Sequence, residues 1–276
     1  MSVFGTYSRY YNLLYKDKDY SGEATYVKTL IDKYLPGATS ILDLGCGTGR
    51  HDFILTEMGF EITGVDMSQE MLTVANAHLS SLTSQQGIAH PSPPTFIHGD
   101  IRSVRLESTF DVVISLFHVM SYQTTNDDLT AAFATARAHL KPGGVFIFDC
   151  WYGPAVLTDR PVVRVKRLED SEFALTRVVE PVMYPNENIV ELDYQIMSRE
   201  KKSGEVEEVK ERHRMRYLFG PEVEYLARNS GMAIVESLEW LTGREPGFDT
   251  WGVCFVAINQ MRDEYLLMRD ERTDES

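Results

Sequence analysis

Cysteine is scarce in this chain, which carries only Cys46, Cys150 and Cys254 among its 276 residues. Three widely spaced cysteines argue against a disulfide framework and against a cysteine-based zinc site, and no metal site is expected. We expect these thiols to be buried or half-buried groups in a reducing cytoplasm.

Long apolar runs are also missing. No stretch reaches the roughly 18 residues that a helix needs to cross a bilayer, which excludes an integral membrane protein. The first residues, Met-Ser-Val-Phe-Gly-Thr-Tyr, lack a basic patch followed by an apolar segment, so no secretory signal is predicted. These absences predict a cytoplasmic protein without a membrane partner.

Positive charge is sparse, since 27 Lys and Arg face 41 Asp and Glu and the net charge is -14. The longest cationic cluster is Lys201-Lys202. Proteins that bind nucleic acid usually present a basic face to the phosphates, so nucleic acid is not an expected partner. A small anionic substrate remains compatible with this charge, because a few arginines in a pocket can hold a phosphate.

Apolar runs that read as strands alternate with amphipathic segments that read as helices. The expected strands are residues 40–44, 60–65, 95–98, 110–115 and 145–149, and the expected helices are 23–34, 51–58, 68–82 and 127–140. A turn is expected at Pro142-Gly143-Gly144. This alternation predicts an α/β fold in which helices cover both faces of a parallel sheet.

The pattern changes at about residue 162, where β-branched residues begin to alternate with polar ones. Turn signals at Pro185-Asn186-Glu187-Asn188 and Lys202-Ser203-Gly204 separate these runs. We expect about four antiparallel strands inserted over residues 161–218.

We therefore divide the chain into a core, an insertion and a tail. The core comprises residues 1–160, with a helical lid at 1–36, and residues 219–260, which contain a helix at 221–230 and strands at 234–241 and 252–258. Residues 261–276 form a charged tail.

The most specific motif is Asp43-Leu44-Gly45-Cys46-Gly47-Thr48-Gly49, which follows one expected strand and precedes a helix. Glycines let the backbone turn tightly and approach a ligand closely. Asp66 ends the next strand, where a carboxylate can accept hydrogen bonds from ribose hydroxyls, and Asp100 follows the third strand beside the same crevice. A dinucleotide fingerprint needs glycine where Arg50 stands, and a Walker loop needs Gly-Lys-Ser/Thr, which is absent.

The spacing acid-x-Gly-x-Gly-x-Gly, which begins at Asp43, resembles motif I of class I S-adenosylmethionine (SAM) methyltransferases. The resemblance implies a Rossmann-like, seven-strand core with an inserted antiparallel β-sheet, and SAM as the cofactor. It makes Asp66 the ribose acid and Asp100 the acceptor of the adenine amine. The expected cofactor-binding residues are Tyr15, Tyr20, Asp43, Gly45, Cys46, Gly47, Asp66, Met67, Asp100, Ile101 and Ser115.

Segments outside this motif resemble the small-molecule N-methyltransferases that build dimethylamino sugars on nucleotide-linked hexoses. These segments are residues 11–15, 18–20, 151–152 and 213–219. The resemblance implies that the inserted sheet contributes to a subunit interface and to the pocket, so a homodimer is expected. Where that family carries Gly-Arg-Gly before the last strand, this chain has Thr250-Trp251-Gly252, so a phosphate of the acceptor is held otherwise or the acceptor differs.

His118 and Tyr122 follow the fourth strand, where substrates bind in such sheets, and they are the candidate catalytic residues. Tyr122 is the better placed of the two to orient an acceptor, whereas a loop histidine bonded to backbone is the commoner role for a residue such as His118. The sequence around the fourth strand offers no acidic residue obviously paired with His118, which favours an amine acceptor, because an amine needs alignment more than it needs a general base. A partner from elsewhere in the fold, including Asp149 or Glu180, stays open.

Four further residues are candidates for the substrate pocket. Trp151 and Tyr152 end the fifth strand and are expected to wall the pocket, with Trp251 near them. Arg214 belongs to an alternating set with Arg212 and Arg216, which forms either a solvated edge or an anion clamp.

The sequence thus predicts SAM-dependent methylation of a small molecule, with the amine of a nucleotide-linked amino sugar as the first choice of acceptor. The alternatives are O- or N-methylation of another small metabolite and a non-catalytic SAM-binding protein.

Overall fold

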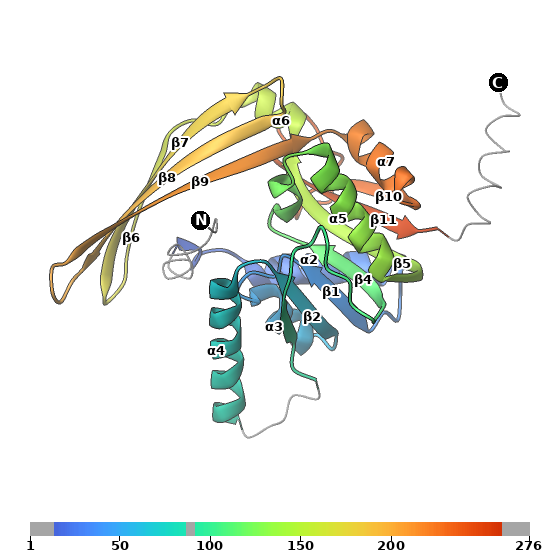
Figure 1. Cartoon of the computed structure of the whole chain (residues 1–276), viewed down its shortest axis with the longest axis horizontal. Helices are drawn as coiled ribbons and strands as arrows, with labels where there is room; N and C mark the ends of the chain where they lie inside the picture. The colour runs from blue at the N-terminus through green and yellow to red at the C-terminus, as the bar shows by residue number, and fades with distance from the viewer. Residues whose placement is uncertain (1–13, 87–91, 261–276) are drawn as a thin grey trace, which may run out of the picture.

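The computed structural model describes residues 14–86 and 92–260 (Figure 1). The first part of the expected N-terminal lid, part of the loop after residue 86 and the charged tail from residue 261 lie outside the described residues.

A parallel sheet forms the centre of the molecule. Its strands are β1 (Ser40–Leu44), β2 (Glu61–Asp66), β3 (Thr95–His98), β4 (Phe110–Ser115) and β5 (Leu140–Tyr152). They pair in the order β3-β2-β1-β4-β5. The direction of winding reverses between β1 and β4, and ligands of such sheets bind at the carboxyl ends of the strands beside this point.

Two further strands complete the core sheet. β11 (Gly252–Asn259) pairs with β5, and β10 (Met232–Glu239) pairs with β11. Of these core strands, only β11 runs opposite to the others. The expected Rossmann-like core of seven strands is therefore confirmed.

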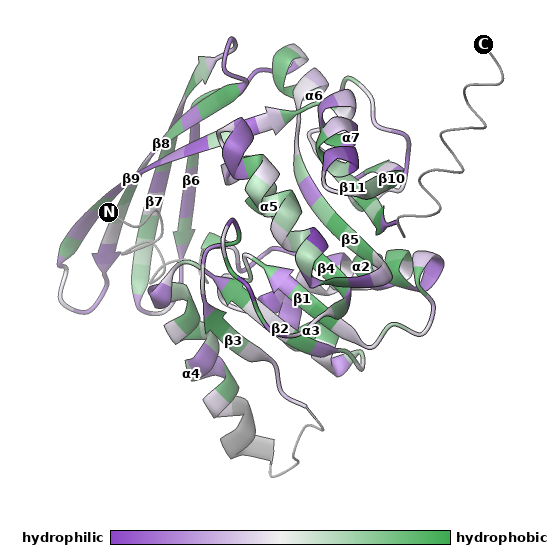
Figure 2. Ribbon diagram, turned by 45° about the vertical axis from the view of Figure 1, so that its right-hand side comes forward, coloured by the Kyte–Doolittle hydropathy of each residue, from purple (hydrophilic) through white to green (hydrophobic). Residues whose placement is uncertain are grey.

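Helices cover both faces of this sheet. α2 (Tyr20–Tyr34) and α3 (Arg50–Glu57) pack on one face, and α5 (Asn126–His139) and α7 (Gly220–Asn229) pack on the other. α4 (Gln69–Gln86) contacts β2 and β3 (Figure 1). Figure 2 shows β4 and β5 as largely hydrophobic, as expected for parallel strands covered on both sides.

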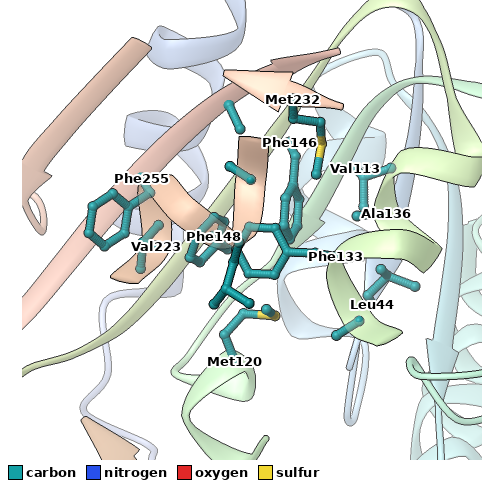
Figure 3. Packing of buried hydrophobic residues seen from close by; sticks show 14 of the residues in the cluster. Leu44, Val113, Met120, Phe133, Ala136, Phe146, Phe148, Val223, Met232 and Phe255 are labelled. Atoms are coloured by element: carbon teal, nitrogen blue, oxygen red, sulfur yellow. The ribbon is translucent and has the colours of Figure 1, made fainter. Parts of the chain in front are cut away.

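An aromatic cluster packs between α5 and the core sheet (Figure 3). The ring of Phe133 on α5 meets those of Phe146 and Phe148 on β5 edge to face, at 5.7 Å and 5.4 Å between centroids. Phe148 in turn stacks on Phe255 of β11 at 5.5 Å. Buried aromatic pairs of this kind add to the stability that burial of their surface already gives, so they help to hold β5 and β11 against α5.

The inserted sheet consists of β6 (Arg164–Glu169), β7 (Phe173–Tyr184), β8 (Ile189–Glu200) and β9 (Val206–Leu218), each antiparallel to its neighbour. Figure 1 shows these strands as a long twisted ribbon that projects from the core. Two residue pairs between β5 and β9, Trp151 with Tyr217 and Tyr152 with Leu218, join the ribbon to the core sheet.

The two faces of the inserted sheet have different surroundings. Leu175, Ile196 and Val209 pack against Leu14, and we call the face that carries them the inner face. Residues paired across neighbouring strands share a face, and successive residues alternate between faces. We call the opposite side the outer face.

Three local features differ from the sequence prediction. β5 begins at Leu140 rather than after the expected turn, because Gly143, at φ +74°, and a register shift against β4 let the strand start as a bulge. A short helix, α6 (Gly153–Thr158), and a 3-10 turn, η1 (Val119–Tyr122), had no clear periodic signal.

Within the described ranges, no helix is long and apolar enough to cross a membrane. The same residues contain no group of three or more His, Cys, Asp or Glu side chains that could hold a metal ion. All three cysteines are free and buried.

Candidate functional site

The segment from Gly45 to Gly49, which we call the glycine loop, follows β1 and contacts the end of β2. The backbone N–H groups of Gly45 and Cys46 both donate to the carbonyl of Val65, at 2.7 Å and 3.1 Å. Gly45 has φ +96°, and a Cβ added there would lie 2.6 Å from Val119 Cγ1. Position 45 therefore admits only glycine, both for its backbone conformation and for the close approach of η1.

Asp66 lies against this loop at the end of β2. Its Oδ2 accepts the N–H of Gly47 at 2.8 Å, and its Oδ1 accepts the N–H of Ser68 at 2.8 Å. Burial raises the pKa of the carboxyl, and the two backbone donors oppose that rise. A Cβ added at Gly47 would meet nothing within 4 Å, so the loop presents an open backbone surface beside the carboxylate. A ligand with vicinal hydroxyls fits this cradle.

Two buried carboxyls lie beneath the loop. Asp43 on β1 is 2% exposed, and Asp52 on α3 is fully buried. Burial is the main reason that the pKa of each is raised, and repulsion from Asp52, Asp66 and Asp149 adds to the rise at Asp43. The glycine loop therefore lies over two carboxyls that keep their protons to a higher pH than an exposed aspartate does.

Sequence reasoning missed Asp52. A signal existed, because glycine within a strand often marks a close approach. A Cβ added at Gly64 of β2 would lie 2.7 Å from Asp52 Oδ2.

The segment before α2 reaches the ends of the strands. The ring of Tyr15 meets Phe117 edge to face at 5.2 Å, and Lys18 Nζ lies 4.2 Å from the centroid of the same ring. Lys18 also forms an ion pair with Glu23, which binds His51 Nε2 at 2.7 Å. Tyr20 is buried, with its ring 5.0 Å from that of His51. Tyr15 and Tyr20 are thus both at this end of the sheet.

A strained turn follows β4. Phe117 and His118 both adopt positive φ, at +65° and +64°. Such conformations cost energy in residues other than glycine and tend to occur at functional sites. Asp149 of β5 accounts for the turn here, because the backbone N–H of His118 lies 3.2 Å from both of its carboxylate oxygens.

The same carboxylate meets the His118 ring. Nδ1 lies 2.6 Å from Asp149 Oδ2, although the angle departs from that of a hydrogen bond. Asp149 is 1% exposed, whereas the His118 side chain is 26% exposed. The histidine that lacked an acidic partner in the sequence therefore has one, contributed by the neighbouring strand.

Aromatic rings surround His118. The ring of Trp151 lies 6.4 Å from that of His118, and Trp251 lies 5.7 Å from Trp151. Tyr152, next along β5, packs instead against the core cluster that includes Leu218, because successive residues of a strand point to opposite faces. The structure therefore brings Trp151 and Trp251 to the same end of the sheet as His118, whereas Tyr152 packs against the core.

Tyr122 connects η1 to the inner face of the inserted sheet. Its hydroxyl and His213 Nδ1 are joined by a hydrogen bond of 2.8 Å, and His213 Nε2 lies 3.1 Å from Glu211 Oε2. Burial raises the pKa of Tyr122 well above its usual value. The arrangement suits a tyrosine that donates to His213 while the opposite ring nitrogen donates to Glu211.

The remaining cofactor candidates fall into two groups. Met67 is 61% exposed, so its side chain is available beside Asp66. Cys46 and Ile101 are buried. The hydroxyl of Ser115 is buried as well and donates to the carbonyl of Leu44 at 2.8 Å, so this side chain links β4 to β1.

Asp100 is engaged by Arg102, which contacts both of its carboxylate oxygens. These bonds are the main reason that its pKa is lowered. An adenine amine would therefore have to share the carboxylate with a guanidinium.

Arg214 lies on the outer face of the inserted sheet, where it pairs with Glu187 at 2.9 Å and with Glu191 at 3.6 Å. Arg212 on the same face pairs with Asp193. Arg216 is buried and bonded to Asn126 and Glu222. Each of the three arginines thus has an acidic partner, as expected for the solvated edge that was the alternative to an anion clamp at Arg212 and Arg214.

The strand order, the glycine loop and the acid at the end of β2 together define a Rossmann-like core of the kind found in SAM methyltransferase structures. Residues 41–144 match the family model described as "Methyltransferase domain".

Two curated relatives that are similar to this chain are N,N-dimethyltransferases. The chain is 35% identical over 151 residues to the dTDP-3-amino-3,4,6-trideoxy-alpha-D-glucopyranose N,N-dimethyltransferase of Streptomyces venezuelae, a match that covers 54% of this chain and 59% of that protein. It is 30% identical over 156 residues to the dTDP-3-amino-3,6-dideoxy-alpha-D-glucopyranose N,N-dimethyltransferase of Streptomyces fradiae, with 56% of each covered. The chain thus spans little more than half the length of these curated relatives.

The likeness to a solved structure extends over nearly the whole chain. The crystal structure of Streptomyces venezuelae DesVI matches with a TM-score of 0.75 at 26% identity, covering 92% of this chain and 98% of that one.

Proposed function

We propose that this protein transfers a methyl group from SAM to the amino group of a nucleotide-linked amino sugar. The observation that supports this most is the similarity to two dTDP-amino-sugar N,N-dimethyltransferases. The pocket suits a neutral sugar amine, because Trp151 and Trp251 offer apolar walls around His118.

In this proposal the glycine loop and Asp66 bind the cofactor, and the residues after β4 bind the acceptor. Bound SAM supplies a methyl group already activated by a positively charged sulfur. Asp66 accepts the ribose hydroxyls, and the exposed Met67 side chain lies on the adenine. Tyr15 and Tyr20 close the site from the N-terminal segment. His118 and Tyr122 align the acceptor nitrogen, and alignment alone supplies a large part of the rate in such a displacement.

The proposal is tested by a screen of SAM turnover, with product mass detected. The acceptors are dTDP-linked amino sugars, the corresponding free amino sugars and simple amines. We expect turnover with a dTDP-linked amino sugar and mass gains of one or two methyl groups. Turnover confined to hydroxyl acceptors, or SAM binding without turnover of any acceptor, contradicts it.

O-methylation is the second candidate, and the His118–Asp149 contact favours it. A buried carboxylate beside an imidazole is an arrangement that orients a general base. An alcohol acceptor must lose its proton as the new bond forms. An amine that has lost its extra proton in solution already has a free lone pair and needs no general base for the attack.

Variants of His118 and Tyr122 separate these two candidates. With an amine acceptor, His118→Ala and Tyr122→Phe should each slow turnover about tenfold or less, below the 10²–10⁴ typical of a general base. The rate should rise with pH through the pKa of the acceptor amine and then level off. A loss of a thousandfold or more in either variant, with SAM affinity unchanged, assigns the enzyme to the O-methylating class.

We further propose that the protein is a cytoplasmic homodimer that assembles through the outer face of the inserted sheet. Val165, Met197 and Val206 on this face are 50%, 38% and 64% exposed, and exposed apolar side chains on one sheet face favour a protein partner. The three free thiols suit a reducing compartment.

Sedimentation should show a dimer at micromolar concentration, and Met197→Glu should shift it toward monomer because a charge would be buried at the interface. The matched control is Val235→Glu on β10, an equally exposed valine outside the inserted sheet, which should leave the dimer intact. A monomeric wild-type protein at that concentration contradicts the proposal.

A further inference from the structure

The end of β3 holds the backbone around Asp66 by two bonds. β3 lies at one end of the strand order, and its last residue, His98, is paired in register with Asp66. The ring Nε2 of His98 lies 3.0 Å from the carbonyl oxygen of Met67, and the N–H of Gly99 donates to the carbonyl of Asp66 at 2.9 Å. A carbonyl oxygen can only accept, so Nε2 carries the proton in the bond to Met67. The turn that follows β2 is therefore held from the neighbouring strand.

Local bonds fix the same turn from within. Asp66 Oδ1 accepts the N–H of Ser68 at 2.8 Å, which closes an Asx turn across Met67. Ser68 Oγ accepts the N–H of Met71 at 3.2 Å and so caps the start of α4. Met67 is thus the central residue of a short, bonded turn, although its side chain is 61% exposed. The bond from His98 adds a side-chain contact to this turn, and a side chain can be replaced without altering the backbone donors.

His98 also bears on the charge of Asp66. Residues paired across neighbouring strands share a face, so the ring of His98 and the carboxyl of Asp66 lie on the same side of the sheet. Burial raises the pKa of Asp66, the N–H groups of Ser68 and Gly47 oppose this rise, and positive charge on His98 opposes it as well. His98 therefore favours the carboxylate form, in which both oxygens accept hydrogen bonds from hydroxyl groups.

We propose that His98 is a positioning residue for the cofactor. By holding the carbonyl of Met67, it fixes the turn that carries two cofactor contacts: the Asp66 carboxylate, which accepts the ribose hydroxyls, and the Met67 side chain, which lies on the adenine. The inference rests on the proposed function, because these two contacts are taken from it. The glycine loop has its own bonds to the carbonyl of Val65, so loss of the His98 ring should displace the turn and leave the loop in place.

The test measures binding of S-adenosylhomocysteine to the full chain by calorimetry, without any acceptor. His98→Leu removes the ring donor and should weaken the affinity roughly threefold to tenfold, as expected for the loss of one hydrogen bond. His98→Gln keeps a donor N–H near the place of Nε2, so this variant should bind with close to the wild-type affinity.

A double variant separates positioning from general loosening of the structure. In the Asp66→Ala protein the turn has lost the carboxylate that His98 positions. Adding His98→Leu to that protein should therefore weaken binding by a clearly smaller factor than adding it to the wild type. A merely structural defect would lower the affinity by the same factor in both backgrounds.

His78→Leu is the matched control. His78 is an exposed histidine farther along α4, where its ring meets that of Phe53 at 4.6 Å between centroids. The substitution removes the same kind of side chain and should leave cofactor affinity unchanged. Thermal unfolding of every variant shows that each is folded at the temperature of the titration.

Two results overturn the inference while the proposed function stands: equal affinity in the His98→Leu, His98→Gln and His78→Leu proteins, or the same loss from His98→Leu with and without Asp66. Failure of the wild type to bind S-adenosylhomocysteine would refute the proposed function and the inference together. Conversely, cofactor binding that depends on His98, without methylation of any amino sugar, would support the inference and refute the proposed acceptor.

Discussion

Replacing Asp66 by alanine should weaken SAM binding by about 1.5–3 kcal/mol, the free energy usually lost with hydrogen bonds to a charged group. The carboxylate lies beside the open backbone of Gly47 and has lone pairs left after accepting two N–H groups. Calorimetry with SAM and with its demethylated product should give the same loss, because both carry the ribose. Unchanged affinity would refute the assignment of Asp66 as the ribose acid.

A matched control is available at the opposite edge of the sheet. Asp111 accepts the backbone N–H groups of Thr39 and Ser40, each at 3.0 Å, so it also ties strand ends together. Asp111→Ala should lower thermal stability as Asp66→Ala does and leave SAM affinity unchanged. The comparison separates loss of a ribose ligand from general loosening of the loop.

The second large effect concerns the buried carboxyl of Asp52. Its folded-state pKa is raised by burial, so in the pH range above the ordinary aspartate value of about 3.9 the unfolded chain releases this proton while the folded chain retains it. The folded state then binds more protons than the unfolded one, and the free energy of unfolding falls as pH rises through that window. Above the folded-state pKa of Asp52, the loss of unfolding free energy has reached its full value and no longer changes with pH.

Asp52→Asn removes this titration and keeps the shape of the side chain. We expect the variant to be more stable than the wild type at pH 8, by about 1–3 kcal/mol. The difference should vanish below pH 4, where Asp52 of the wild type is protonated in the folded and in the unfolded state. Urea unfolding across this pH range measures it. Glu57→Gln, an exposed carboxyl on the same helix, serves as the control and should change stability little. An Asp52→Asn protein that is less stable at every pH contradicts the argument.

The sequence was informative where local chemistry decides the structure. β1, β3 and β4 occupy the predicted residues, because glycines, prolines and charged residues bound short apolar runs. The glycine loop and Asp66 come together as predicted, because adjacent parallel strands end at the same edge of the sheet.

The sequence was less informative where partners lie far apart in the chain. The contact of His118 with Asp149 joins the turn after β4 to β5 and depends on the register of these two strands. The orientation of Arg214 could in principle be inferred from alternation, since His213 and Arg214 must point to opposite faces, but which face meets the core depends on the tertiary fold. Two consecutive non-glycine residues at positive φ have no sequence signal, because the carboxylate that holds them comes from another strand.

The junction between β5 and β11 also bears on how this chain reaches its fold. Trp151 pairs with Gly252, and the whole inserted sheet lies between them in sequence. The core sheet therefore stays incomplete on the ribosome until the insertion has emerged and the chain has returned to the edge of β5. Closing so long a loop before its contacts form slows folding and leaves the apolar side of β5 exposed in the meantime. The hairpins of the insertion have local contacts and can form first, so the inserted sheet also brings the last strand back to its partner.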